Sequence, residues 1–191
     1  MSNKKLIALF MLLTIVPLFV SAGVRDAYGH NAFVKESTQD ARIIKEVRHE
    51  LATLPYYGVF DWLEFVVQPD NTVVLRGQVV RPTTKSDAEA RVKEIDGVSR
   101  VVNEIEVLPL SGVDDRLRIA VYRTLYNWNS PLFRYATQAV PPIHIIVKNG
   151  HVTLKGVVDS KMDAQLAYMR ARGVPGSFEV KSELQITGGA R

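Results

Sequence analysis

"VVLRGQVV", Val73 to Val80, and "VTLKGVVD", Val152 to Asp159, are two copies of one strand pattern in this chain of 191 residues. Each copy has apolar residues at alternate positions before a central glycine, Gly77 in the first and Gly156 in the second, which sets an offset of 79 positions. The sequences after both copies continue to match at this offset without a gap. Since a fixed offset of this kind indicates an internal repeat, we expect two copies of one structural unit.

The segment before each strand pattern has the spacing of an amphipathic helix, with apolar residues every three to four positions. Asp40 and Asp114 stand at the starts of these segments and are expected to cap the helices. The two segments align at an offset of 74 rather than 79. The second copy must therefore carry extra residues between its first helix and its first strand, within the aromatic-rich stretch Thr124 to Pro142.

Turn residues follow at matching places in both copies. Asn149-Gly150 lies between two alternating runs and predicts a two-residue hairpin turn of type I′. The first copy keeps its alternation only if Pro69-Asp70-Asn71 forms a three-residue loop. A second helix follows each hairpin, and capping boxes are expected at its start, at Thr84 to Asp87 and at Ser160 to Asp163.

Four glycines at matching positions are expected to have structural roles. Gly97 and Gly176 end the second helices, where the chain must turn at positive φ. Gly77 and Gly156 lie within strands, where a missing side chain indicates a bulge or the close approach of another element.

The resulting order is helix, strand, strand, helix, strand, and it occurs twice. This αββαβ unit predicts an α+β fold, because a three-stranded sheet with one apolar face needs cover and two amphipathic helices can supply it. The modules are expected at residues 40–109 and 113–187. The opposite face of the sheets is expected to be exposed to solvent and carries the charged residues Arg76, Glu104, Glu106, Lys155, Lys181 and Glu183.

The N-terminus indicates export. Lys4 and Lys5 precede an apolar run that ends in Val20-Ser21-Ala22, so residues 1–22 are interpreted as a secretory signal peptide. The run is too short for a membrane-spanning helix. Residues 23–39 show no period and are interpreted as a flexible tether. The chain has no cysteine, which excludes disulfides and lipid attachment at an N-terminal cysteine, and a periplasmic location is expected.

The repeated motifs resemble the BON domain, a family named after bacterial OsmY and nodulation proteins. The first copy reads "VVLRGQVV…DGVSRVVNEIEV" and the second reads "VTLKGVVD…PGSFEVKSELQI". The resemblance implies a non-enzymatic module, periplasmic or associated with the outer membrane, that contacts phospholipid. Tandem copies are linked to envelope maintenance and osmotic stress tolerance, and the resemblance carries over no catalytic residues.

The remaining side chains do not form a recognisable chemical site. The histidines His30, His49, His144 and His151 are scattered, without metal-ligand spacing, so neither a metal nor another cofactor is expected. The chain lacks a phosphate loop and a nucleophile motif, which argues against an enzyme. Removing residues 1–22 lowers the net charge from +4 to +2, too little for a nucleic-acid-binding footprint.

The second copy carries a candidate interaction surface. Its segment 110–187 has a net charge of +4, whereas segment 40–109 has −3. On a helical wheel, Trp128 falls on the side expected to face the sheet. The opposite side and the residues that continue it combine aromatic, aliphatic and basic side chains, namely Arg116, Arg118, Ile119, Tyr122, Arg123, Tyr126, Leu132, Phe133, Arg134 and Tyr135.

These residue types are typical of groups that settle among lipid headgroups. The sequence therefore predicts reversible binding of anionic phospholipid, in support of envelope integrity or osmotic stress tolerance. Two alternatives stay open. The surface can instead pack against the first module, whose opposite charge favours docking, or it can bind an envelope protein, as in a periplasmic chaperone or adaptor.

Overall fold

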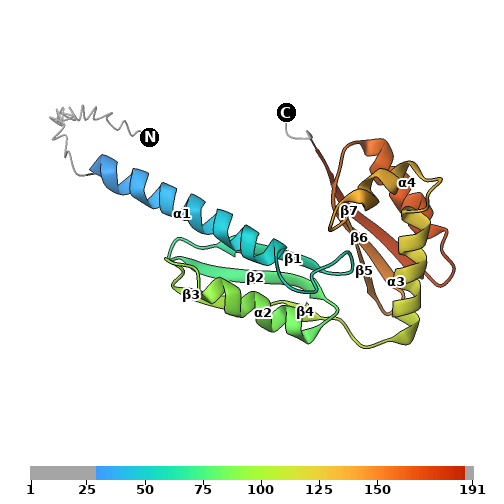
Figure 1. The fold of residues 1–191 in the computed structure, drawn as a ribbon, viewed down its shortest axis with the longest axis horizontal. Helices are drawn as coiled ribbons and strands as arrows, with labels where there is room; N and C mark the ends of the chain where they lie inside the picture. Colours follow the sequence, from blue (N-terminus) through green and yellow to red (C-terminus); the bar gives the residue numbers. More distant parts are fainter. Residues whose placement is uncertain (1–28, 188–191) are drawn as a thin grey trace, which may run out of the picture.

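The computed structural model describes residues 29–187, with side chains from residue 39 onward; the predicted signal peptide at 1–22 lies outside this range. The described chain forms two α+β modules in the predicted order (Figure 1). The first module consists of α1 (Gly29–Ala52), β1 (Trp62–Val67), β2 (Thr72–Val79), α2 (Pro82–Lys93), β3 (Arg100–Asn103) and the short β4 (Glu106–Val107). The second consists of α3 (Gly112–Leu125), the 3-10 helix η1 (Pro131–Thr137), β5 (Ile143–Lys148), β6 (His151–Val158), α4 (Lys161–Arg172) and β7 (Glu179–Ile186).

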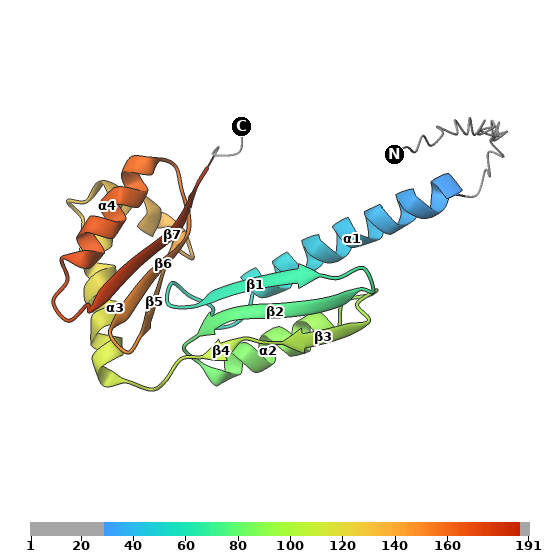
Figure 2. The ribbon, with the colours of Figure 1, turned by 180° about the vertical axis from the view of Figure 1, so that it is seen from behind.

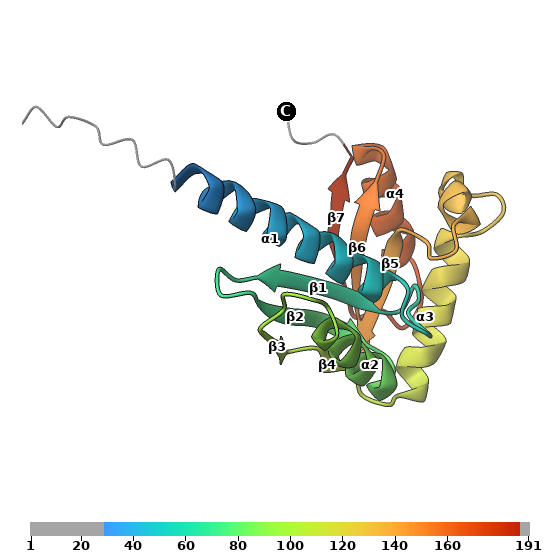
Figure 3. The same cartoon turned by 60° about the vertical axis from the view of Figure 1, so that its left-hand side comes forward.

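Both sheets have the same topology. The central strand, β2 or β6, is antiparallel to the strand before it and parallel to the strand that follows the second helix. The third strand is continuous in the second module but divided into β3 and β4 in the first. The strands of one sheet run across the direction of those of the other (Figure 3).

Each module has its own core between the helices and one sheet face. In the first, Ile43, Val47, Val73, Leu75 and Val92 are fully buried, and the second buries the matching positions of α3, β6 and α4. Complete burial of an aliphatic side chain stabilises a fold by about 1.5–3 kcal/mol. The apolar positions that recur along the helices and strands therefore form one core layer in each module.

The hairpin predictions are confirmed. Asn149 and Gly150 have φ of 52° and 77°, as a type I′ turn requires. In the first hairpin the N–H of Gln68 donates to the carbonyl of Thr72 (2.8 Å), which leaves a three-residue loop.

The predictions for the two strand glycines are confirmed as well. Gly77 has φ of 125°, and a Cβ there would lie 1.9 Å from the carbonyl oxygen of Trp62. Gly156 has φ of 120°, and its Cβ would lie 1.9 Å from the carbonyl oxygen of Pro142. In both modules, therefore, the start of the first strand lies directly against the glycine of the second. The prediction that Gly97 and Gly176 end the second helices is wrong, although both have the expected positive φ of 93°. Helix α2 ends at Lys93 and α4 at Arg172, and the two glycines lie in the turns that follow.

Several predicted helix starts are wrong. Helix α1 begins at Gly29, so Asp40 lies inside it, and residues 29–39 are helical rather than an irregular tether, since they contain no proline to interrupt a helix. Helix α3 is capped by Ser111, whose hydroxyl accepts from the N–H of Asp114 (3.2 Å).

The capping boxes of the second helices differ. Ser160 caps α4 as predicted, accepting from the N–H of Asp163 (3.1 Å). Thr84 does not cap α2, because Pro82, whose fixed φ suits the first helical turn, starts the helix earlier and leaves Thr84 buried.

Candidate functional site

The structure divides the surface predicted on the second module. Arg116, Ile119, Arg123 and Arg134 are exposed, and Tyr122 and Phe133 are half-buried. The prediction is wrong for four members of the set, which are buried: Arg118, Tyr126, Leu132 and Tyr135.

Tyr126 is buried and Trp128 is exposed, the reverse of the prediction, because α3 ends at Leu125. Tyr126 follows as the C-cap with φ of −98° and ψ of 28°, so the helical step of about 100° per residue no longer applies to it or to later residues. Tyr126 is 6% exposed and its hydroxyl donates to the carbonyl of Ile143 (2.8 Å). Trp128 was expected in the core but is 79% exposed, with its ring 4.8 Å from that of Phe133.

The 3-10 helix η1 turns Leu132 and Tyr135 into the core of the second module. Tyr135 donates its hydroxyl hydrogen to Asp163 (3.1 Å) and accepts from the N–H of Asp159 (2.9 Å). Arg134 pairs with Asp163 (2.6 Å). Burial alone would raise the pKa of Asp163, but its bonds to Ser160, Tyr135 and Arg134 hold that pKa below the usual range. This network joins η1 to the start of α4.

Arg118 is buried because its charge is used inside the module. Its Nη2 donates to the carbonyl of Val147 (2.7 Å), and its Nη1 pairs with Asp115. The aligned residue of the first module is Ile44, so the repeat gives no signal for this contact.

Tyr122 takes part in packing between the modules, the first of the alternatives that the sequence left open. Its ring meets that of Phe60 edge-on, with 6.1 Å between centroids. Phe60 belongs to the segment between α1 and β1, which Figure 2 shows reaching β5. In this segment Val59 accepts a hydrogen bond from the N–H of Ile145 (2.8 Å), so the first module adds a backbone contact to the second module's sheet.

Charges reinforce the junction. Lys155 of β6 lies 3.4 Å from Glu64 of β1, and Lys148 pairs with Glu106. The side chain of Lys155 is only 17% exposed, so its predicted solvent exposure is wrong; the first module lies against it. Arg76 and Glu104 form an exposed pair (2.8 Å) on the outer face of the first sheet, where exposure was expected.

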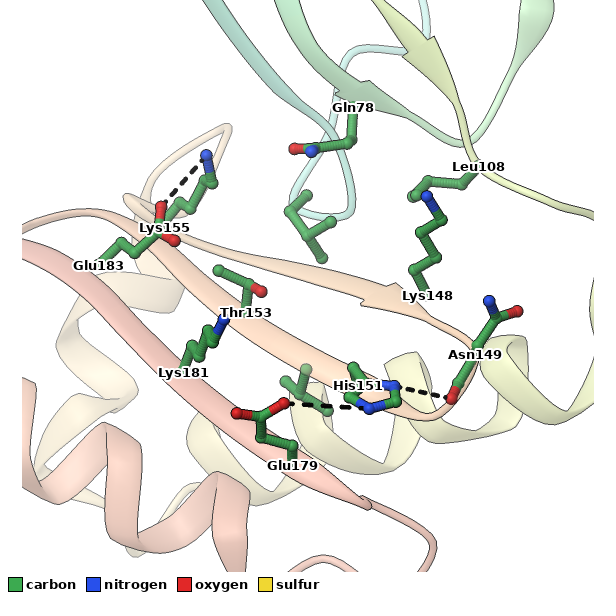
Figure 4. Close-up of a pocket in the computed structure, with 12 residues that line it drawn as sticks. Gln78, Leu108, Lys148, Asn149, His151, Thr153, Lys155, Glu179, Lys181 and Glu183 are labelled. Carbon is green, nitrogen blue, oxygen red and sulfur yellow. Dashed lines mark hydrogen bonds and ion pairs between the residues drawn. The ribbon is translucent and has the colours of Figure 1, made fainter.

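A polar groove lies between the open face of the second sheet and the end of the first module (Figure 4). Gln78 and Leu108 face Lys155, Lys181 and Glu183 across it. Its charges are largely paired with one another, for example Lys155 with Glu183 (3.3 Å). These pairs hold the groove together and contain no nucleophile with an adjacent base.

Within residues 29–187, whose side chains are described from residue 39 onward, no group of three or more described histidine or acidic side chains could hold a metal ion. None of the helices in this range is long and apolar enough to cross a membrane.

A family model of the BON domain matches residues 39–109 and 133–188. The chain belongs to the BON domain family. The second BON match begins within η1, so α3 and Trp128 lie outside it. This position agrees with the extra residues that the repeat predicts between α3 and β5.

Comparison with solved structures also gave matches. The C-terminal domain of CdsD, a structural protein of the type III secretion system of Chlamydia trachomatis, is 12% identical over 76% of this chain and 97% of that chain, with a TM-score of 0.28. A second CdsD structure is 13% identical over 76% of this chain and 92% of that chain, also with a TM-score of 0.28. Among curated proteins, none matches the chain.

Proposed function

We propose that this BON protein is a non-enzymatic component of the bacterial cell envelope that binds anionic phospholipid reversibly. The exposed tryptophan of the second module carries the proposal. Trp128 contacts Phe133 beyond the end of α3 with tilted rings and is 79% exposed, although a large aromatic side chain is normally buried. Tryptophan prefers the headgroup level of a bilayer, where its ring is partly apolar and partly hydrated.

The charge around Trp128 supports an anionic surface. Residues 116–158 contain four arginines and two lysines and no acidic residue. Arg116, Ile119 and Arg123 are all exposed and recur on one face of α3, which makes an exposed basic stripe. Arg118 and Arg134 are engaged in internal contacts and contribute less.

An apolar groove adjoins the basic stripe. Ile119 and Tyr122 line it with Phe60 and Pro141, and Arg123 lies at its edge. Apolar side chains beside arginines suit the boundary between headgroups and acyl chains.

The magnitudes support weak association. Each basic residue near an anionic membrane contributes on the order of 1 kcal/mol, so two free arginines and one tryptophan give reversible binding rather than an anchor. The expected biological role is support of envelope integrity under osmotic stress, from the periplasmic side.

Co-sedimentation with vesicles tests this function. The protein without its predicted signal should sediment with phosphatidylglycerol vesicles and not with phosphatidylcholine vesicles, and binding should weaken at about 0.5 M salt, where charges are screened within a few ångströms. Trp128→Ala should lower the bound fraction at least fivefold. Tyr56→Ala is the matched control, because Tyr56 is an exposed aromatic residue (68%) beside Arg81 on the first module.

Fluorescence gives a second measurement. The chain has two tryptophans, so Trp62→Phe leaves Trp128 as the reporter, and its emission should shift to shorter wavelength on phosphatidylglycerol vesicles. Equal binding to both lipids, or full binding by Trp128→Ala, would contradict the proposal.

A further inference from the structure

The outer edge of β5 is closed by three hydrogen bonds. The carbonyl of Ile143 accepts from the hydroxyl of Tyr126 (2.8 Å), and the carbonyl of Val147 accepts from Arg118 (2.7 Å). Between them, the N–H of Ile145 donates to Val59 of the first module (2.8 Å). An edge strand normally presents unpaired backbone groups that invite another strand, and on β5 these three groups have partners.

Strand β1 is the equivalent edge of the first module. Phe65 pairs with Leu75 as Ile145 pairs with Leu154. The N–H of Gln68 points inward to Thr72, so the alternation of an antiparallel strand directs the N–H of Phe65 away from the sheet.

The side chains that close β5 have no counterpart at the aligned positions of the first module, although Tyr57 contacts the β1 edge at the backbone of Leu63. Arg118 aligns with Ile44, and Tyr126 aligns with Ala52, at the offset of 74 that relates the first helices. Neither isoleucine nor alanine can donate a side-chain hydrogen bond. Among the described residues, the N–H of Phe65 therefore has no partner like the one that Val59 gives to Ile145, and the β1 edge is open at this position.

A groove runs along the open edge, between α1 and β1. Its lining includes the apolar or aromatic side chains of Ile44, Leu51, Tyr57, Leu63 and Phe65, together with the charged residues Arg48 and Glu64. Figure 2 shows β1 along the border of the sheet next to α1. In the second module, the corresponding place between α3 and β5 receives Val59 and Phe60, which pack against its core. Because Val59 and Phe60 occupy this place in the second module, a segment with similar side chains should suit the groove of the first module.

We propose that the groove between α1 and β1 binds an extended peptide segment of a partner protein, carrying an aliphatic and an aromatic residue in sequence as Val59 and Phe60 do. The segment pairs its backbone with Phe65 of β1 and inserts its apolar side chains between β1 and α1. Backbone pairing of this kind supplies affinity, and the side-chain pockets supply specificity. This site is separate from the surface around Trp128 on the second module, for which lipid binding is proposed above.

A peptide copied from the chain itself is the probe. A synthetic peptide with the sequence of Tyr56 to Trp62, blocked at both ends, is titrated into the protein without its predicted signal, and amide hydrogen exchange is followed by NMR. At saturation, exchange at the Phe65 amide should slow at least tenfold. The Ile145 amide, which already has a partner, should exchange at the same rate with and without peptide.

Ile44→Arg copies the Arg118 contact into the first module and should weaken peptide binding at least tenfold. Val113→Arg is the matched control, because it adds the same charge at an exposed apolar helix position (61%) on the other module, and its affinity should stay unchanged. The Phe65 measurement on the parent protein stands even if Ile44→Arg does not fold. Absence of binding at millimolar peptide overturns the proposal. Faster exchange at Ile145 without protection of Phe65 also overturns it, since the peptide would then be displacing Val59.

Discussion

The ring of His144 in the second module is bonded to the backbone of Asp61 in the first, with Nδ1 2.6 Å from the carbonyl oxygen. Because a carbonyl can only accept, Nδ1 carries the hydrogen in this contact. The rings of Tyr57 and Trp62 lie 5.7 and 5.1 Å away, so the imidazole is enclosed by the first module. The junction between the repeats is therefore built around a buried histidine.

This histidine makes the stability of the protein depend on pH. Burial lowers the pKa of His144 below its ordinary value of 6.5, against the opposing effect of the carbonyls of Asp61 and Gly58. The unfolded chain thus binds the proton more readily, so the contribution to stability is complete above pH 6.5 and is lost as pH falls below it. Melting temperature should decrease between about pH 7.5 and 5.5.

His144→Asn provides the comparison, because its amide nitrogen can replace Nδ1 as a donor without titrating. The decrease in melting temperature over this pH range should be smaller in this variant. The carboxyl of Asp61, whose pKa is raised by burial, changes stability in the opposite direction, and both proteins retain it. Identical pH profiles would show that His144 does not govern the acid sensitivity.

The two strand glycines should not tolerate a side chain. Gly156→Ala places a Cβ 1.9 Å from the Pro142 carbonyl oxygen, at a residue whose φ is 120°, and both backbone segments must shift to relieve the contact. We expect a loss of at least about 2 kcal/mol in the free energy of unfolding, measured with urea. Gly112→Ala is the control, since its nearest contact would be 3.7 Å away in a helix, where alanine is favoured over glycine.

Asp114 should stabilise the second hairpin rather than cap α3. Its carboxylate accepts from the N–H groups of Asn149 and Gly150, both at 2.8 Å. Asp114→Ala should lower the free energy of unfolding by about 2 kcal/mol, because two backbone donors, of which that of Gly150 is buried, lose a charged acceptor. Asp40→Ala, at the aligned position inside α1, should cost less than half as much. Equal losses in the two variants would assign the effect to the helix and not to the turn.

The elements of the fold could be predicted from the sequence because each rests on a local pattern. The Asn149-Gly150 turn, the strand glycines and the repeated strand alternation needed no knowledge of distant contacts. The BON motifs at Val73 and Val152 led to the family that the comparison shows.

The surface could not be predicted in the same way. Placing Tyr126 and Trp128 on a helical wheel assumed that α3 continues past Leu125, and η1 then folds Leu132 and Tyr135 inward. The junction residues also gave no signal, since Asp61 and His144 are distant in sequence and have no matching roles in the repeats. Packing between the modules depends on contacts between residues distant in sequence, which a periodic pattern of apolar residues does not predict.

The closed edge of β5 also limits how copies of this chain can associate. The first half reaches its neighbour with the short segment around Val59, whereas the corresponding segment of the second half folds into η1. The second half therefore lacks the extended arm needed to grip the β1 edge of the next molecule. The contact between the two modules therefore cannot be repeated from one molecule to the next, and this arrangement does not propagate into a fibre.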